Sequence, residues 1–74
     1  MEQHSADEIA RHVPRMYRVA YRMIADPDRA HDVAQEACVK ALAKVNEFDG
    51  RSQLSTWLHR ITVNCAKVAM RSSS

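Results

Sequence analysis

One candidate binding surface in this sequence combines two carboxylates, an amide and a valine near the middle of the chain. The four residues are Asp32, Gln35, Glu36 and Val39, which are spaced i, i+3, i+4 and i+7. A helix places residues with this spacing on a single face, so their side chains form one patch. Because no nucleophile, base and orienting group accompany the carboxylates, the sequence does not favour an enzyme. The patch instead predicts a surface that meets a partner.

A second candidate surface is a row of basic and amide side chains near the C-terminus. The row consists of Arg60, Asn64, Lys67 and Arg71, at positions i, i+4, i+7 and i+11. Arginine and lysine can neutralise phosphates, and asparagine offers the paired donor and acceptor that base edges require. From Arg51 to the end there is no acidic residue, so polyanion binding is expected in this third of the chain. From the residues alone, a solvated helix face favoured by the helix dipole explains the row equally well.

Apolar residues at helical spacing predict three helices that position these surfaces. In the first helix, which begins near Asp7, the stripe is Ile9, Val13, Met16, Tyr17, Ala20, Met23 and Ile24. In the central helix, over 26–45, it is Ala30, Val33, Ala34, Ala37, Cys38, Ala41, Leu42 and Val45. In the third helix it is Leu54, Trp57, Leu58, Ile61, Thr62, Cys65, Val68 and Ala69.

The composition agrees with an all-α fold. One glycine and two prolines among 74 residues are too few turn residues for a many-stranded sheet, and the length suits a single small core. We predict a three-helix bundle over residues 1–71. Residues 72–74 form the start of a linker or a remnant of cloning.

Helix boundaries can be read from particular residues. Pro14 should kink or split the first helix, because proline lacks an amide and disfavours helical geometry in the residues before it. Asp26 precedes Pro27, a pairing typical of a capped helix start. Ser52 or Ser55 can cap the third helix.

The connection between the central and third helices holds the only glycine and the only phenylalanine of the chain. Phe48, between polar neighbours, is expected to anchor this loop to the core, and Trp57 should be the largest contributor to that core. The remaining surface of the first helix carries Arg11, Arg15, Arg18 and Arg22, an arrangement that is more often a solvated face than a binding site.

Metal, cofactor and membrane functions are not expected. Cys38 and Cys65 lie on the apolar stripes, where free cysteine behaves as a small hydrophobe. The four histidines show no ligand spacing with each other or with the cysteines. Without a signal peptide or an 18-residue apolar run, we expect a soluble cytoplasmic protein that has no cofactor and no membrane partner.

Three strings in the sequence resemble region 2 of bacterial sigma factors of the extracytoplasmic-function class. They are AHDVAQEACVKAL at 30–42, NEFDGRSQLSTWLHRI at 46–61 and TVNCAK at 62–67. The resemblance extends over about 9–71 and implies the sigma region 2 type of helical fold. It also implies a transcription initiation factor rather than an enzyme.

The resemblance implies two interfaces. In the family, the helix that carries the Asp and Gln-Glu pattern binds the clamp helices of the RNA polymerase β′ subunit, which here assigns Asp32, Gln35, Glu36 and Val39 to polymerase binding. The loop and third helix of the family recognise the promoter minus-ten element as a non-template single strand with a flipped base. The corresponding DNA-binding residues are Phe48, Asp49, Gly50, Arg51, Ser52, Arg60, Asn64, Lys67 and Arg71.

Other interpretations of the sequence remain open. The family's second domain, which reads the minus-thirty-five element, has no counterpart here, so this domain alone should not direct complete initiation. The main alternative is a small three-helix protein-interaction module without DNA readout, for example one bound by an anti-sigma factor. A helix-turn-helix reader of duplex DNA is weaker, because a seven-residue loop rather than a tight turn joins the last two helices.

Overall fold

Within the part of the chain that the structure describes, all the regular secondary structure is helical. A computed structural model of the protein describes residues 6–72. Its elements in chain order are α1 (Ala6–Arg11), α2 (Val13–Ile24), α3 (Pro27–Lys44), the short 3-10 helix η1 (Val45–Glu47) and α4 (Leu54–Ser72). These elements confirm the predicted all-α class. None of the helices in residues 6–72 combines the length and apolarity that crossing a membrane requires.

The first predicted helix is split where the proline was expected to interrupt it. α1 ends at Arg11, α2 begins at Val13, and His12 between them is a turn. The His12 amide donates to the Ile9 carbonyl at 3.0 Å, and the His12 carbonyl accepts from the Met16 amide at 3.0 Å. Pro14 therefore lies in the first turn of α2, where its missing amide removes no helical hydrogen bond.

A tight junction turns the chain from α2 into α3. The Ala25 amide donates to the Tyr21 carbonyl at 2.7 Å, and Ala25 has the left-handed backbone conformation, with φ of 61°. Asp26 then caps α3, because its Oδ1 accepts from the amides of Asp28 at 3.0 Å and Arg29 at 3.2 Å. The predicted cap is confirmed.

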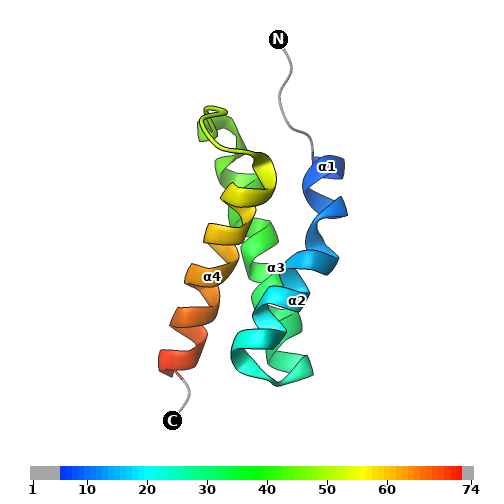
Figure 1. Ribbon diagram of the computed structural model, residues 1–74, viewed down its shortest axis with the longest axis vertical. Coiled ribbons are helices and arrows are strands. Elements are labelled where there is room, and N and C mark those ends of the chain that lie inside the picture. The colour runs from blue at the N-terminus through cyan, green and yellow to red at the C-terminus, as the bar shows by residue number, and fades with distance from the viewer. Residues whose placement is uncertain (1–5, 73–74) are drawn as a thin grey trace.

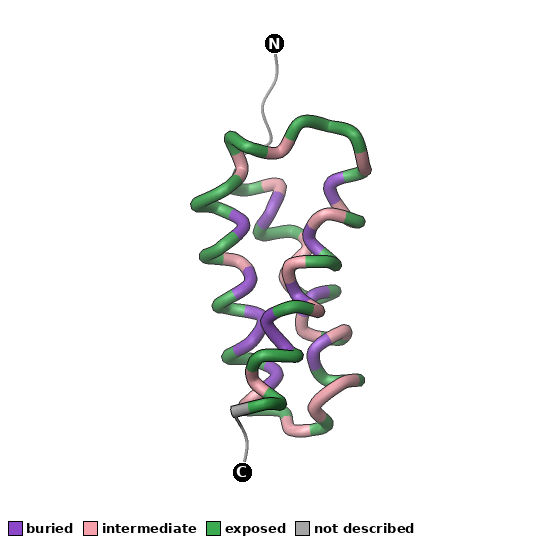
Figure 2. The backbone as a smooth tube through the Cα atoms, turned by 90° about the vertical axis from the view of Figure 1, so that its left-hand side faces the viewer, coloured by how far each residue is buried: buried purple, intermediate pink, exposed green. Residues whose placement is uncertain are grey.

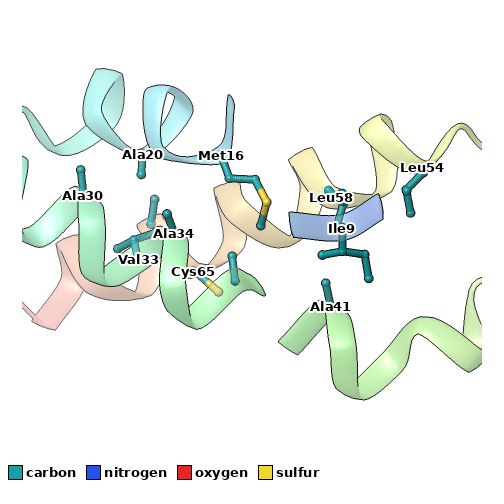
Figure 3. Packing of buried hydrophobic residues seen from close by; sticks show 12 residues of the cluster. Ile9, Met16, Ala20, Ala30, Val33, Ala34, Ala41, Leu54, Leu58 and Cys65 are labelled. Carbon is teal, nitrogen blue, oxygen red and sulfur yellow. The ribbon is translucent and has the colours of Figure 1, made fainter. Parts of the chain in front are cut away.

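The three long helices lie side by side in an elongated molecule of 45 × 19 × 17 Å. In Figure 1, α2 and α3 run antiparallel, α4 packs along them, and the loop before α4 lies at the same end as α1. Buried residues occupy the inner sides of the helices (Figure 2). Ile9 of the short α1 is fully buried, and Figure 3 shows its side chain directed toward Ala41 of α3.

Small side chains fill much of the core. α3 contributes Val33 and four fully or almost fully buried alanines, Ala30, Ala34, Ala37 and Ala41. Ala20 of α2 lies opposite Ala30 in Figure 3. Because alanine adds only a methyl group, these helices can pack closely, and a chain of this size fills its core without many large residues.

Two residues of the predicted stripes are exposed. Leu42 is 40% exposed and Val68 is 50% exposed, whereas Ala66, which the stripe omitted, is fully buried. The buried side of α4 passes through Cys65, Ala66 and the half-buried Ala69. Val68 is rotated about 100° from Ala69 around the helix axis, which takes it off that side.

The start of α4 also differs from its prediction. The Gln53 carbonyl accepts from the Trp57 amide at 3.1 Å, so Gln53, rather than Ser52 or Ser55, occupies the N-cap position. At the other end, Ser72, the first residue of the linker predicted at 72–74, is the last residue of α4, and Ser73 and Ser74 lie outside the described residues.

Candidate protein and nucleic-acid interfaces

The outer face of α3 carries the first predicted binding patch. Asp32, Gln35, Glu36 and Val39 are all exposed there, and Val39 is 63% exposed, the highest value among the large hydrophobic residues described as exposed. The opposite side of the same helix is buried against α2 and α4. α3 therefore places the acidic, amide and apolar groups together on the side that faces away from the core.

Two neighbouring side chains contact this patch. The Glu36 carboxylate lies 3.5 Å from the Lys40 ammonium, an exposed i, i+4 pair of the kind that contributes only a few tenths of a kcal/mol. The Gln35 amide nitrogen lies 3.5 Å from Nε2 of His31. Both contacts are weak. The carboxylate and the amide can therefore give up these contacts for contacts with a partner at little cost in free energy.

An open hollow of about 380 Å³ lies between the loop before α4 and the first turns of α4. Its wall includes an aromatic pair, because the rings of Phe48 and Trp57 are tilted against each other with centroids 5.0 Å apart. The lining residues are Glu47, Phe48, Asp49, Arg51, Ser52, Trp57 and Arg60. The hollow thus combines aromatic surface with polar and charged groups at its rim, as binding sites for small planar groups commonly do.

The tip of this loop is held by Asp49. Its Oδ1 accepts from the Arg51 amide at 3.0 Å, and its Oδ2 lies 3.1 Å from Nε of Arg51. Gly50 between them has a φ of 80°, a conformation that glycine adopts without steric cost. The Arg51 side chain is 90% exposed, so it extends into solvent at the mouth of the hollow.

The predicted basic row lies along the outer side of α4. Arg60, Asn64, Lys67 and Arg71 are all exposed, opposite the buried Thr62 and Cys65. At 1.5 Å per residue the row extends about 16 Å along the helix axis. Of these four residues, only Arg60 also lines the hollow, where it joins the predicted loop residues Phe48, Asp49, Arg51 and Ser52.

A comparison with models of protein families shows to which family the chain belongs. A family model described as Sigma-70 region 2 matches residues 9–74. The chain belongs to the sigma-70 region 2 family.

Similar proteins agree with this membership. The chain is 37% identical over 59 residues to the ECF RNA polymerase sigma factor SigW of Bacillus subtilis, covering 80% of this chain and 32% of that protein. It is 48% identical over 46 residues to the RNA polymerase sigma-H factor of Pseudomonas aeruginosa, covering 62% of this chain and 24% of that protein. It is 38% identical over 61 residues to the ECF RNA polymerase sigma factor SigE of Mycolicibacterium smegmatis, covering 81% of this chain and 23% of that protein. This sigma region 2 chain thus spans a third or less of these relatives, and no solved structure matches it significantly.

The sequence did not predict two of the residues that line the Phe48–Trp57 hollow. Trp57 was predicted as the main core residue, but it is only half-buried and lines the hollow with Phe48. Glu47, from η1, adds an acidic group to the same wall. A lone phenylalanine in a polar loop, followed by tryptophan in the first turn of the next helix, was the available signal for a shared aromatic wall.

Neither cysteine of this sigma region 2 domain is placed for metal binding. Residues 6–72 contain no group of three or more His, Cys, Asp or Glu side chains that could hold a metal ion. Burial raises the pKa of the Cys65 thiol; nearby Lys40 acts in the opposite direction and Glu36 in the same direction. The raised pKa disfavours the thiolate, so Cys65 acts as an apolar residue of the core.

Proposed function

We propose that this domain is a transcription initiation module that binds core RNA polymerase through α3 and the promoter minus-ten element through α4 and its preceding loop. The observation that carries the proposal is the aromatic-walled hollow bordered by Arg60, at the start of a helix with no acidic residue. Membership of the sigma-70 region 2 family supports both halves of the proposal. The names of the relatives, all RNA polymerase sigma factors, point to the same partner.

The polymerase half rests on the outer face of α3. Asp32 and Glu36 supply negative charge, Gln35 supplies an amide, and Val39 supplies apolar area that is unburied in the isolated domain. Such a patch fits a basic helical surface, with the apolar contact at the centre and ion pairs around it. The partner in the proposal is the pair of β′ clamp helices.

The DNA half rests on the hollow and the basic row. A base extruded from the non-template strand can stack against the Phe48–Trp57 wall while polar groups at the rim contact its edge. The backbone on one side of that base then follows Arg60, Asn64 and Lys67 along α4. Asn64 is the residue of the row best suited to contact a base, because its amide both donates and accepts.

The first experiment measures binding of the domain to core RNA polymerase and to a β′ clamp-helix fragment. We expect saturable binding by the wild type and at least tenfold weaker binding by the double variant Gln35→Ala, Glu36→Ala, since a tenfold loss corresponds to about 1.4 kcal/mol. Lys40→Ala is the matched control, because it breaks the Glu36 ion pair but leaves the patch intact. No binding by a folded wild type would overturn the polymerase half and leave the interaction-module alternative.

A second experiment compares a fluorescein-labelled single strand of about 12 nucleotides and mixed sequence with the same sequence as a duplex. We expect preference for the single strand, with a salt slope near −3 if about four phosphates are neutralised. Asn64→Ala and Trp57→Ala should weaken single-strand binding, whereas Lys44→Ala, on α3, should not. Stronger binding to the duplex would contradict the proposed single-strand role.

A further inference from the structure

Two of the long helices, α2 and α4, contain no acidic residue. α2 and α4 together hold six of the eleven basic residues of the chain and none of its nine acidic residues. The basic residues are Arg15, Arg18, Arg22, Arg60, Lys67 and Arg71. All six side chains are exposed, and within residues 6–72 none of them forms an ion pair with a carboxylate. α2 and α4 therefore carry six exposed positive charges that no carboxylate of the described residues compensates.

A second hollow opens between α2 and the first turns of α4. It has a volume of about 250 Å³ and is lined by Arg15 from α2 and by Ser55, Thr56 and His59 from α4. A narrow crevice of about 10 Å³ adjoins it, shares Arg15, Ser55 and His59, and has an apolar floor that includes Met16 and Leu58. The crevice has room for at most one water molecule, so a ligand would be held by the open hollow.

The chemistry of the lining favours a phosphate group. A guanidinium can bind a phosphate with two parallel hydrogen bonds, and two hydroxyls and an imidazole provide further donors. No carboxylate lines either the hollow or the crevice to repel an anion. The hollow offers no wall of paired aromatic rings like that of Phe48 and Trp57, so it suits the backbone of a strand better than a base.

The two hollows flank the same turns of α4 on different sides of the helix. Trp57 and Arg60 line the first hollow, whereas Ser55, Thr56 and His59 line the second. A helix with its side chains is about 10–12 Å wide, so a strand that crosses α4 at this point could reach both. The two sites are thus arranged as successive contacts for one extended polyanion.

We propose that the hollow formed by Arg15, Ser55, Thr56 and His59 binds a backbone phosphate of the same single strand whose base occupies the Phe48–Trp57 hollow. This inference rests on the proposed function and extends the strand path from α4 onto α2. The contact fixes the position of the strand but reads no sequence, as phosphate contacts generally do. The proposal assigns a DNA-binding role to Arg15, which the sequence predicted on a solvated face.

The test uses two fluorescein-labelled single strands, one of about four nucleotides and one of about 12, which span the range of single-strand site sizes. Arg15→Ala should weaken binding of the long strand about tenfold at low salt and make its salt slope shallower by about 0.7, the change expected for one phosphate. Binding of the short strand, which can occupy the aromatic hollow alone, should change much less. Arg15→Lys should restore most of the salt slope but only part of the affinity, because lysine lacks the paired geometry of arginine.

Lys44→Ala removes the same charge from α3 and serves as the control for a general electrostatic effect. Equal losses for Arg15→Ala and Lys44→Ala would overturn the proposal, and so would an unchanged salt slope in Arg15→Ala. Arg15 is exposed, so the variant should keep its helical circular dichroism. A further arm uses polyglutamate as an acidic peptide; loss of polyglutamate binding without loss of strand binding would assign the hollow to a protein partner and overturn the proposal.

The failure of this inference can be told apart from failure of the proposed function. If Arg60→Ala weakens both strands while Arg15→Ala weakens neither, the strand binds through α4 alone and only the second contact is wrong. If the wild type binds neither strand, the proposed DNA-binding function fails first, and the second contact fails with it.

Discussion

Nη2 of Arg29, in the first turn of α3, donates a hydrogen bond to the carbonyl oxygen of Ala69, near the end of α4, at 2.8 Å. The last four carbonyls of a helix lack helical partners, and Ala69 is among them in a helix that ends at Ser72. A positive charge at this end of a helix is also favourable to its dipole. The contact joins the start of the helix proposed to bind polymerase to the end of the helix proposed to bind DNA.

Replacing Arg29 by methionine should lower the free energy of unfolding by about 1 kcal/mol, less than a fully buried hydrogen bond to a charged group contributes, because the contact is only partly buried. For a domain of this size the melting temperature should fall by about 4–8 °C. Urea titration measures the first quantity, and hydrogen exchange should show faster exchange in the last turn of α4. Arg22→Met, at an exposed position of α2, is the control; an equal loss of stability there would argue against a specific role for the Arg29 contact.

Within residues 6–72, Ala25 and Gly50 have positive φ, and the stability of the protein should respond in opposite directions to exchange between alanine and glycine at these two positions. Ala25, with φ of 61°, bears the steric cost of the left-handed conformation, so Ala25→Gly should raise the free energy of unfolding by about 0.5–1 kcal/mol. Gly50→Ala should lower it by a similar amount, because a methyl group at Gly50 meets no atom within 4 Å and the cost is confined to the backbone. Thermal melts of both variants check the prediction, which a loss of stability in Ala25→Gly would contradict.

The side-chain cap of α3 by Asp26 should contribute about 1 kcal/mol to the free energy of unfolding. Asp26→Ala removes the acceptor for the amides of Asp28 and Arg29, whereas Asp26→Ser keeps an acceptor and should retain most of the stability. Because the cap begins the helix that carries the binding patch, hydrogen exchange of its first turn should increase in the alanine variant. An alanine variant as stable as the serine variant would show that the cap contributes little.

The two cysteines should differ in reactivity. Cys65 is 4% exposed and burial raises its pKa, whereas Cys38 is only half-buried, so iodoacetamide should modify Cys38 first in the native protein. Mass spectrometry of timed samples identifies the site. Modification of Cys65 at a rate equal to that of Cys38 would contradict the buried position.

The raised pKa of Cys65 also implies a pH dependence of stability. The folded state holds the thiol proton more tightly than the unfolded state, so the stabilisation is fully present below the ordinary pKa of 9.0 and is lost as the pH rises through the higher folded value. The free energy of unfolding should therefore fall more steeply above pH 9.0 in the wild type than in Cys65→Ala. Parallel slopes would indicate that this thiol does not contribute.

Much of the fold follows from local sequence signals. The alanine-rich stripe of α3, the Asp26 cap and the split near Pro14 are encoded within a few residues, and each is found where it was predicted. Val68 was assigned to the wrong side of α4. Helical periodicity predicts which residues share a stripe, but it does not predict how much of that stripe the neighbouring helices cover. The binding patch of α3 lies within one helix, so its shared face was predictable, although its role as a polymerase contact stays a prediction.

Features that join distant segments were not predictable in the same way. The Arg29 contact with Ala69 links residues 40 positions apart, and no local pattern indicates it. The hollow with Arg15 and His59 requires α2 and α4 to be packed side by side, so each residue taken alone resembles an ordinary exposed group. Trp57 was misplaced for a related reason, since tryptophan can both pack on a core and line a surface hollow.

The absence of acidic residues from α2 and α4 also bears on how the molecule approaches its ligands. α2 and α4 carry six basic residues and no acidic one, whereas α3 carries three of each, so the charge of the three long helices is asymmetric, as in an electric dipole. In the field of a polyanion this dipole experiences a torque that turns α2 and α4 forward before any contact forms. If the domain binds a strand as proposed, the outer face of α3 is then directed away from it, and this effect weakens as salt shortens the range of the field.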